Sequence, residues 1–274
     1  PYHYRNKVIS TFAPAAGGKL TSGIYAARTH KVLPVESCLL EDEVLDKVLL
    51  AVRAAANNKA AAVQAAHTHC ACGGSISAGG HTSHSDVTYQ PWSGTSDRDI
   101  IYTNNTAYVY LTGNATLGGH LTVDGKTLYL CLNGKTLSSN GSGKIQVKNG
   151  GHLVLCDCQG GGTFKGATKN VWGGACVYLY TSTFDMFGGK LTGGKVTGSG
   201  GGGAIALDDQ QCVFNMYGGE ISSNNGKNYG GAIFQNFAKN KPNATGGKFN
   251  MYGGTIKDNT AKNGGAFFST TGGN

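Results

Sequence analysis

A short alternation of apolar and polar residues occurs three times in the C-terminal half of the chain. Each copy reads Phe, a polar residue, Met, an aromatic residue and two glycines, over residues 184–189, 214–219 and 249–254. A second phrase, which begins Gly-Gly-Ala, alternates with the first at residues 202–207, 230–235 and 264–269. Self-similarity at a period of about 30 residues is typical of proteins built from stacked structural units.

The alternation inside the first phrase predicts a β-strand, and the glycine pair predicts a turn with positive φ. Phe and Met should face the interior, while the polar residue between them should face outward. No long helical pattern separates these runs, so they do not form βαβ units. We therefore predict a mainly β protein, a right-handed parallel β-helix (solenoid) over residues 101–274, with a small α+β fragment N-terminal to it.

A position five residues after each glycine pair is also repeated, as Gly194, Asn224 and Asn259. Gly and Asn tolerate the left-handed region, so we expect a repeated corner at these residues. Stacked Asn side chains can also form hydrogen bonds from one repeat to the next.

Weaker alternating runs precede the repeats at residues 107–111, 120–123, 127–132 and 152–158. Asp-Gly and Asn-Gly turns separate them, which favours further coils of the solenoid, with hairpins as the alternative. Cys156 and Cys158 share a face of the last run. We interpret them, with Cys131, as buried thiols that point inward, and a disulfide is the alternative.

Residues 1–56 have few glycines and an ordinary globular texture. Apolar residues at three- and four-residue spacing predict a helix over residues 37–56, with Ser37 as its N-cap. Residues 7–13 and 23–27 are predicted as strands on either side of a Gly-Gly turn.

Several pieces of this segment resemble the central region of the RNA (uracil-5-)-methyltransferases. They are Pro1-Tyr-His-Tyr-Arg-Asn-Lys7, Gly23-Ile-Tyr-Ala26, Thr29-His30 and Leu33-Pro-Val-Glu-Ser-Cys38. The resemblance implies a cytoplasmic enzyme that uses S-adenosylmethionine, with Cys38 where some members place a ligand of a 4Fe–4S cluster. It also implies RNA contact, for which the candidates are Arg5, Lys7, Arg28 and Lys31.

The methyltransferase resemblance ends near residue 56. The cofactor-binding fingerprint and the catalytic cysteine of the family have no counterpart in the chain. We therefore expect no methyltransferase activity from this chain as it stands. Residues 57–66 form a junction rich in alanine. The composition changes there from few glycines to many, which suggests an incomplete or artificial join.

Histidine and cysteine gather where the second part of the chain begins. The candidate zinc ligands are His67, His69, Cys70, Cys72, His81 and His84. Zinc binds four ligands of these types, although the spacing of these residues differs from that of well-known zinc fingers. An exposed linker with a cysteine pair is the alternative for this lead-in, residues 67–100.

Composition and charge narrow the classes of function. The chain has 274 residues, 45 of them Gly, and a net charge of +8. Basic residues are scattered beyond residue 60, which indicates a solvated surface rather than a nucleic-acid footprint. No apolar run is long enough to span a membrane.

Residues 66–274 resemble large adhesin-like surface proteins of gut Firmicutes, through the His/Cys cluster, residues 130–136 and 155–161 and the Met-Tyr-Gly-Gly repeats. That resemblance implies an extracellular or cell-surface location. The last coil ends at Phe267-Phe268 without a capping element, from which we expect a truncated solenoid. Phe187, Tyr217 and Tyr252 are the candidates for an exposed aromatic stripe that could bind a glycan or another host-surface ligand, and packing of these rings at a coil corner is the alternative.

We therefore predict a non-catalytic surface or adhesion-type module that carries an incomplete methyltransferase segment. RNA uracil methylation is the alternative. A polysaccharide-active enzyme is a second alternative, although it would need paired carboxylates or a calcium site on one face.

Overall fold

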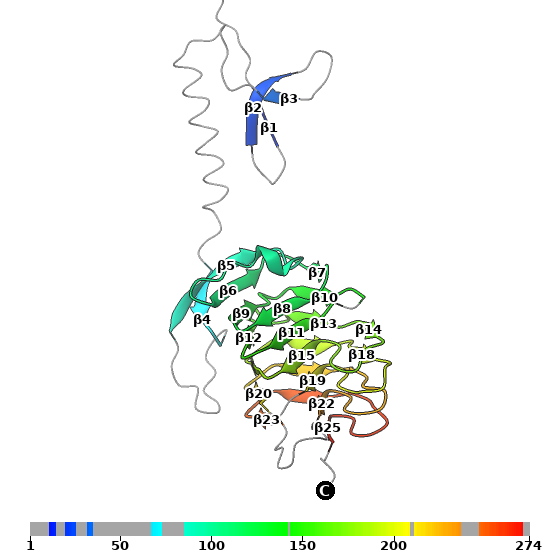
Figure 1. The fold of residues 1–274 in the computed structure, drawn as a ribbon. Helices are drawn as coiled ribbons and strands as arrows, with labels where there is room; N and C mark the ends of the chain where they lie inside the picture. Colours follow the sequence, from blue (N-terminus) through cyan, green and yellow to red (C-terminus); the bar gives the residue numbers. More distant parts are fainter. Residues whose placement is uncertain are drawn as a thin grey trace, which may run out of the picture. The chain divides into compact units, whose positions relative to one another are not determined.

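The computed structural model describes residues 11–14, 20–25, 32–34, 67–72, 85–141, 143–208, 211–236 and 247–270. The chain divides into two compact units, residues 1–66 and residues 67–274 (Figure 1). Each unit is described by itself.

The first unit contains a three-stranded antiparallel sheet in the order β1 (Thr11–Pro14), β2 (Leu20–Tyr25) and β3 (Val32–Pro34). The strands β1 and β2 overlap the two predicted strands, and β3 was not predicted. The predicted helix over residues 37–56 lies outside the described residues, as do Cys38 and the RNA-contact candidates Arg5, Lys7, Arg28 and Lys31.

Three long sheets make up the second unit, and between β6 and β25 every strand pairs in parallel with its neighbours (Figure 1). One sheet has eight strands, and we name the other two, of six strands each, the β7 sheet and the β8 sheet. A coil is the stretch of chain that contributes one strand to each of them. This arrangement confirms the prediction of a mainly β protein with parallel strands, and it is compatible with a β-helix.

The eight-stranded sheet consists of β4 (His67–Cys70), β5 (Asp86–Trp92), β6 (Thr106–Leu111), β9 (Thr127–Cys131), β12 (His152–Cys156), β16 (Thr183–Met186), β20 (Val213–Met216) and β23 (Lys248–Met251). The β7 sheet consists of β7 (Ala115–Leu117), β10 (Thr136–Ser139), β13 (Thr163–Lys165), β17 (Lys190–Thr192), β21 (Glu220–Ser222) and β24 (Thr255–Lys257). The β8 sheet consists of β8 (Leu121–Asp124), β11 (Ile145–Lys148), β15 (Val177–Tyr180), β19 (Ile205–Leu207), β22 (Ile233–Gln235) and β25 (Phe267–Ser269). A pair of short strands, β14 (Thr168–Lys169) and β18 (Lys195–Val196), lies in the loops between the last two sheets.

The repeated phrase lies in register across the eight-stranded sheet. Phe184 pairs with Phe214, and Phe214 pairs with Phe249, while the three methionines of the phrase pair in the same way. The rings of the three phenylalanines are stacked, with centroids 4.9 and 5.1 Å apart. Phe214 and Met216 are fully buried. The prediction that Phe and Met fill the interior is therefore confirmed for the first two copies, while in the last copy Phe249 is partly buried and Met251 is 48% exposed.

The polar residue of the phrase forms a ladder on the opposite face of the same sheet. The amide of Asn250 donates to Asn215 at 2.8 Å, and the amide of Asn215 donates to Asp185 at 2.7 Å. Asp185 also contacts Nε2 of His152 at 2.8 Å. The polar side chains thus satisfy one another's hydrogen-bonding groups from one coil to the next.

The turns follow the prediction in part. The second glycine of each pair has positive φ, +79° at Gly189, +84° at Gly219 and +87° at Gly254. The predicted left-handed corner at Gly194, Asn224 and Asn259 was wrong by one position, because the residues with positive φ are Gly193, Ser223 and Asp258.

The reason lies in the side chain of Asn224, which is buried and turned into the corner. Its Oδ1 accepts from the backbone N–H of Gly194, and its Nδ2 donates to Leu191 O and to Asn259 Oδ1. These bonds form the expected link from one repeat to the next.

The lead-in belongs to the sheets rather than to a separate module. The strand β5 pairs in parallel with β6, and β4 pairs antiparallel with β5. A short 3₁₀ helix, η2 (Asp97–Asp99), with Ser96 as its N-cap, follows β5.

Candidate metal centre

The two histidines of the cluster lie on β4, at the first edge of the eight-stranded sheet. Alternate residues of a strand point to the same side, so His67 and His69 project together. Each imidazole is stacked on a tyrosine ring. His67 lies on Tyr110 with ring centroids 4.1 Å apart, and His69 lies on Tyr89 with centroids 4.2 Å apart.

Two cysteines from later coils reach the same point. Cys131 is the last residue of β9, and Cys158 lies two residues beyond the end of β12, the neighbouring strand. The loop after β12 is fixed by Asp157. Its carboxylate accepts hydrogen bonds from the backbone N–H groups of Gly134 at 2.7 Å and Gly162 at 2.6 Å.

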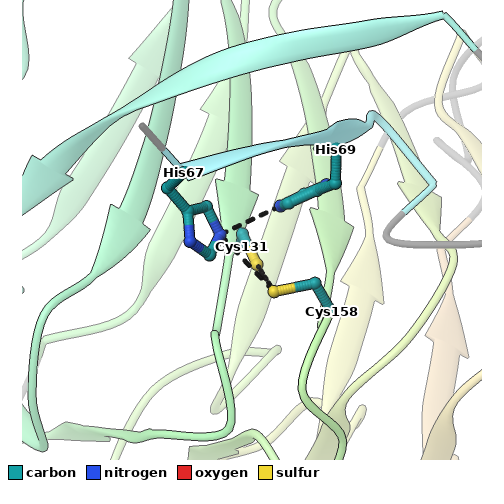
Figure 2. A group of neighbouring side chains, drawn as sticks. All are labelled: His67, His69, Cys131 and Cys158. Atoms are coloured by element: carbon teal, nitrogen blue, oxygen red, sulfur yellow. Dashed lines mark hydrogen bonds between the residues drawn. The ribbon is translucent and has the colours of Figure 1, made fainter. Parts of the chain in front are cut away.

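The donor atoms of His67, His69, Cys131 and Cys158 all lie within 4.8 Å of one another (Figure 2). The two imidazole Nε2 atoms are 3.1 Å apart, and the two Sγ atoms are 3.5 Å apart. Nε2 of His67 is also 3.4 Å from Sγ of Cys158. Figure 2 shows the four side chains converging from β4 and from the ends of two neighbouring strands of later coils.

Two of these spacings are close to the edges of a small coordination tetrahedron. With Zn–N of about 2.0 Å and Zn–S of about 2.3 Å, the edges are roughly 3.3 Å between nitrogens and roughly 3.8 Å between sulfurs. The measured 3.1 and 3.5 Å are slightly shorter, while the set as a whole spreads over up to 4.8 Å, which is longer than any such edge. Side-chain rotations that open the short pairs and draw in the more distant donor would therefore be needed to admit a metal ion of this size.

A second layer of contacts orients the candidate ligands. Nδ1 of His69 lies 2.6 Å from the carbonyl oxygen of Cys70. A proton on Nδ1 would donate to that oxygen and leave Nε2 with its lone pair toward the cluster. Asn133, whose Nδ2 donates to Leu111 O at 3.0 Å, lies beside Sγ of Cys158 at 3.7 Å.

The electrostatics of the cluster favour a thiolate at Cys131. A hydrogen bond from Cys156 is the main reason why the pKa of Cys131 lies well below its usual range, and His69 adds to the effect. Burial acts to lower the pKa of His69, but its hydrogen bonds to Cys131 and to the Cys70 carbonyl raise it overall. Burial and the charge of Cys131 raise the pKa of Cys158 to about 12. Two adjacent sulfurs resist carrying negative charge together without a cation.

Of the predicted ligands, the structure brings together only His67 and His69. The Sγ atoms of Cys70 and Cys72 lie 3.0 Å from each other, and both residues are buried outside the four-residue cluster. His81 and His84 lie outside the described residues.

The prediction missed Cys131 and Cys158 as candidate ligands because it placed the cysteines of these runs in the interior. Cys131 and Cys156 are buried thiols as predicted, but they do not point into the main core. They belong to a second apolar cluster with Cys70, Cys72 and Tyr89, whereas Leu130 and Leu155 belong to the main core. The signal was present in the sequence, because leucines at alternate positions fix the inward face and leave the cysteines out of phase with it.

The predicted aromatic stripe is stacked but only partly exposed. Phe187, Tyr217 and Tyr252 follow one another with ring centroids 4.5 and 5.0 Å apart and nearly parallel planes. The packing alternative holds for Phe187, of whose surface only 6% is accessible, whereas 47% of Tyr252 is accessible. Phe187 is buried because it packs in the second apolar cluster. Ring faces turned toward each other are closed to a ligand, so the tyrosine hydroxyl edges are what this row offers.

Comparison with known proteins gives one short match. A stretch of 49 residues, 18% of this chain, is 41% identical to an uncharacterized RNA methyltransferase of Clostridium tetani (strain Massachusetts / E88). The chain spans about a tenth of the length of that curated relative, since the match covers 10% of it. No protein-family model matches the chain, and no solved structure matches it significantly. The methyltransferase resemblance is thus supported over a short segment, and the resemblance to surface proteins stays a prediction.

Within the described part of the chain, no helix combines the length and the apolar character needed to cross a membrane.

Proposed function

We propose that residues 67–274 form a non-catalytic module whose first strand is fastened to a right-handed parallel β-helix by a structural zinc ion. One observation carries the proposal. Two imidazole nitrogens and two sulfurs, contributed by His67, His69, Cys131 and Cys158, converge within 4.8 Å although they come from three separate segments.

The donor set favours zinc in a structural role. Two cysteines and two histidines are a common tetrahedral set for structural zinc, and soft sulfur ligands disfavour calcium and magnesium. All four positions would be filled by protein. A catalytic zinc keeps one position for water or substrate, so this centre would hold the fold together rather than perform a reaction.

The proposed zinc would connect segments that are far apart in sequence. His67 and Cys158 are 91 residues apart, and a bond through the metal closes that loop and lowers the entropy of the unfolded chain. The strand β4 lies at the edge of the eight-stranded sheet. Terminal elements of a repeat array need such a cap to protect the first coil.

The experiment is a measurement of metal content. We expect the purified full chain, reconstituted with zinc and dialysed, to retain about one zinc ion per chain by elemental mass spectrometry. His69→Ala and Cys131→Ser should lose this zinc, whereas His152→Ala, which removes a histidine from the same sheet outside the cluster, should keep it. Retention of zinc by His69→Ala and Cys131→Ser alike would refute the proposed ligand set.

The biological role that we propose is adhesion at the cell surface, in an extracellular location, with a glycan or another host-surface molecule as ligand. The exposure of Tyr252, 47% of its surface, supports this role, since a tyrosine carries a hydrogen-bonding group beside an apolar ring. Glycan-array binding should fall for Tyr252→Ala and persist for Tyr180→Ala. Tyr180 is the matched control because it is similarly exposed, at 43% of its surface, on the β8 sheet.

RNA uracil methylation is the second candidate, and the 49-residue match to an RNA methyltransferase is the observation that favours it. We propose that residues 1–56 are part of the central region of such an enzyme, followed by a junction at 57–66, the lead-in at 67–100 and the β-helix at 101–274. The chain should transfer no methyl group from S-adenosylmethionine to ribosomal or transfer RNA. Turnover that depends on Arg28 or Lys31 would establish the methyltransferase assignment instead.

A further inference from the structure

The two sulfur ligands of the candidate centre are in contact with each other. Cys131 ends β9 and Cys158 follows β12, the neighbouring strand, with Sγ atoms 3.5 Å apart, which is close enough for a bond to form after a small side-chain rotation. Cys131 is fully buried, but Cys158 is only partly buried. A small oxidant can therefore reach one member of the pair.

We propose that Cys131 and Cys158 are a site of oxidative modification, at which a hydroperoxide converts the two zinc thiolates into a disulfide and releases the metal. The inference rests on the proposed zinc centre.

The reaction balances in two steps. The Cys158 thiolate attacks one oxygen of the hydroperoxide, the O–O bond breaks, and the alkoxide leaves as an alcohol after it takes a proton. This leaves a sulfenic acid on Cys158. The Cys131 thiolate then attacks that sulfur, the S–S bond forms, and hydroxide leaves as water after a second protonation. The two sulfurs lose two electrons in total, and the peroxide gains them.

The fold favours this pair over its neighbours. Cys156 is the register partner of Cys131 on the next strand, but it is fully buried beside the hydroxyl of Tyr89, at 3.8 Å. Cys158 stands in the loop after β12, is only partly buried, and contacts the exposed Gln159, whose Nε2 donates to Sγ at 3.8 Å. Access thus selects Cys158 for the first step, and contact selects Cys131 for the second.

Loss of zinc would loosen β4 while the coils stay intact. A disulfide has no negative charge to hold the metal, and two histidines alone bind zinc weakly. The strand β4 would then depend on its pairing with β5 and on the stacking of His67 and His69 against tyrosine rings.

The test treats the zinc-loaded full chain with hydrogen peroxide and follows zinc release with a chromogenic chelator. Peptide mass spectrometry after alkylation maps the disulfide. We expect zinc to appear in step with a Cys131–Cys158 disulfide, and a thiol reductant to restore zinc binding. The variant Cys158→His keeps four candidate donors but cannot form the disulfide, so it should bind zinc and retain it under the same peroxide treatment. Cys212→Ser, which changes a cysteine of the main core, should behave as the wild type.

Zinc that stays bound in the oxidised wild type, or that leaves without a Cys131–Cys158 disulfide, would overturn the inference and leave the zinc centre standing. Absence of zinc from the untreated, reconstituted protein would refute the centre itself and the inference with it. If Cys158→His fails to fold, disulfide mapping and zinc release in the wild type still test the inference.

Discussion

Nε2 of His67 lies 3.4 Å from Sγ of Cys158, a contact between residues that are 91 positions apart in the chain. The contact joins the first strand of the second unit to the loop that follows β12, the first strand of the third coil. It exists because β5 adds to the sheet edge in parallel while β4 turns back on it. If a metal ion occupies this point, its removal should affect β4 first.

Chelation should therefore loosen the lead-in without unfolding the coils. We expect hydrogen exchange of the β4 amides to become faster by about tenfold or more after zinc is removed, because ligand loss favours local opening. Exchange in β20, which lies two strands beyond β12 and three beyond β9 in the same sheet, should be unchanged. Equal protection of β4 with and without zinc would show that the metal does not fasten it.

The phenylalanine stack gives a prediction on stability. Phe214 is fully buried between Phe184 and Phe249, whereas Phe249 is only partly buried. Phe214→Ala should lower the free energy of unfolding by about 3–5 kcal/mol through lost burial and a cavity. Phe249→Ala should cost clearly less. Urea denaturation of the two variants checks this order, and a larger loss at Phe249 would contradict it.

A glycine of the second repeated phrase gives a prediction on backbone geometry. Gly202 has φ of +76°, and a Cβ atom there would lie 2.2 Å from the carbonyl oxygen of Ile205. Gly202→Ala should therefore destabilise the protein by more than about 1 kcal/mol. Gly119 has open space where a Cβ would stand, so Gly119→Ala should be tolerated. Thermal unfolding of both variants distinguishes the steric effect from a general effect of losing glycine.

Lys144 gives a prediction on alkaline pH. It is buried beside the carbonyl oxygen of Gly173, to which Nζ donates at 2.9 Å. Burial and the neighbouring charge of Lys169 lower the pKa of Lys144 from 10.5 to about 8, although Asp208 opposes the shift. Above pH 8 the folded protein loses this proton while the unfolded chain keeps it up to about pH 10.5. The free energy of unfolding should thus rise by at most about 3 kcal/mol as the pH increases from 8 to 10.5.

The control for this prediction is Lys148, which ends the strand that begins directly after Lys144. Lys148 on β11 is more exposed, and its Nζ lies 3.6 Å from Asp124. Lys144→Met should abolish the rise in stability between pH 8 and pH 10.5, measured by urea unfolding, and Lys148→Met should preserve it. A rise that survives in Lys144→Met would assign the effect to another group.

The sequence predicted the parts of the fold that depend on local alternation. Phe214 and Met216 face the core, and Asn215 faces outward, because side chains alternate along a strand and the phrase recurs in register. It misplaced the left-handed corner, since the hydrogen bonds of the Asn224 side chain decide which residue turns. Such bonds join residues of different coils and leave no mark on local pattern.

The candidate metal centre was likewise predictable from the sequence only in part. His67 and His69 could be predicted because they stand two residues apart in a cluster of soft ligands. Cys131 and Cys158 could not be assigned to them from spacing alone, since the contact depends on how β4 packs across two later coils. Cys70 and Cys72 were nearer in sequence and belong to the buried set beside the centre.

X-ray absorption at the zinc edge tests the central claim most directly, on the full chain reconstituted with one equivalent of zinc. The claim predicts a four-coordinate ion with two nitrogen ligands at about 2.0 Å and two sulfur ligands at about 2.3 Å. Cys158→His should change the set to three nitrogens and one sulfur. A shell of oxygen and nitrogen without sulfur, in the wild type, would contradict the claim.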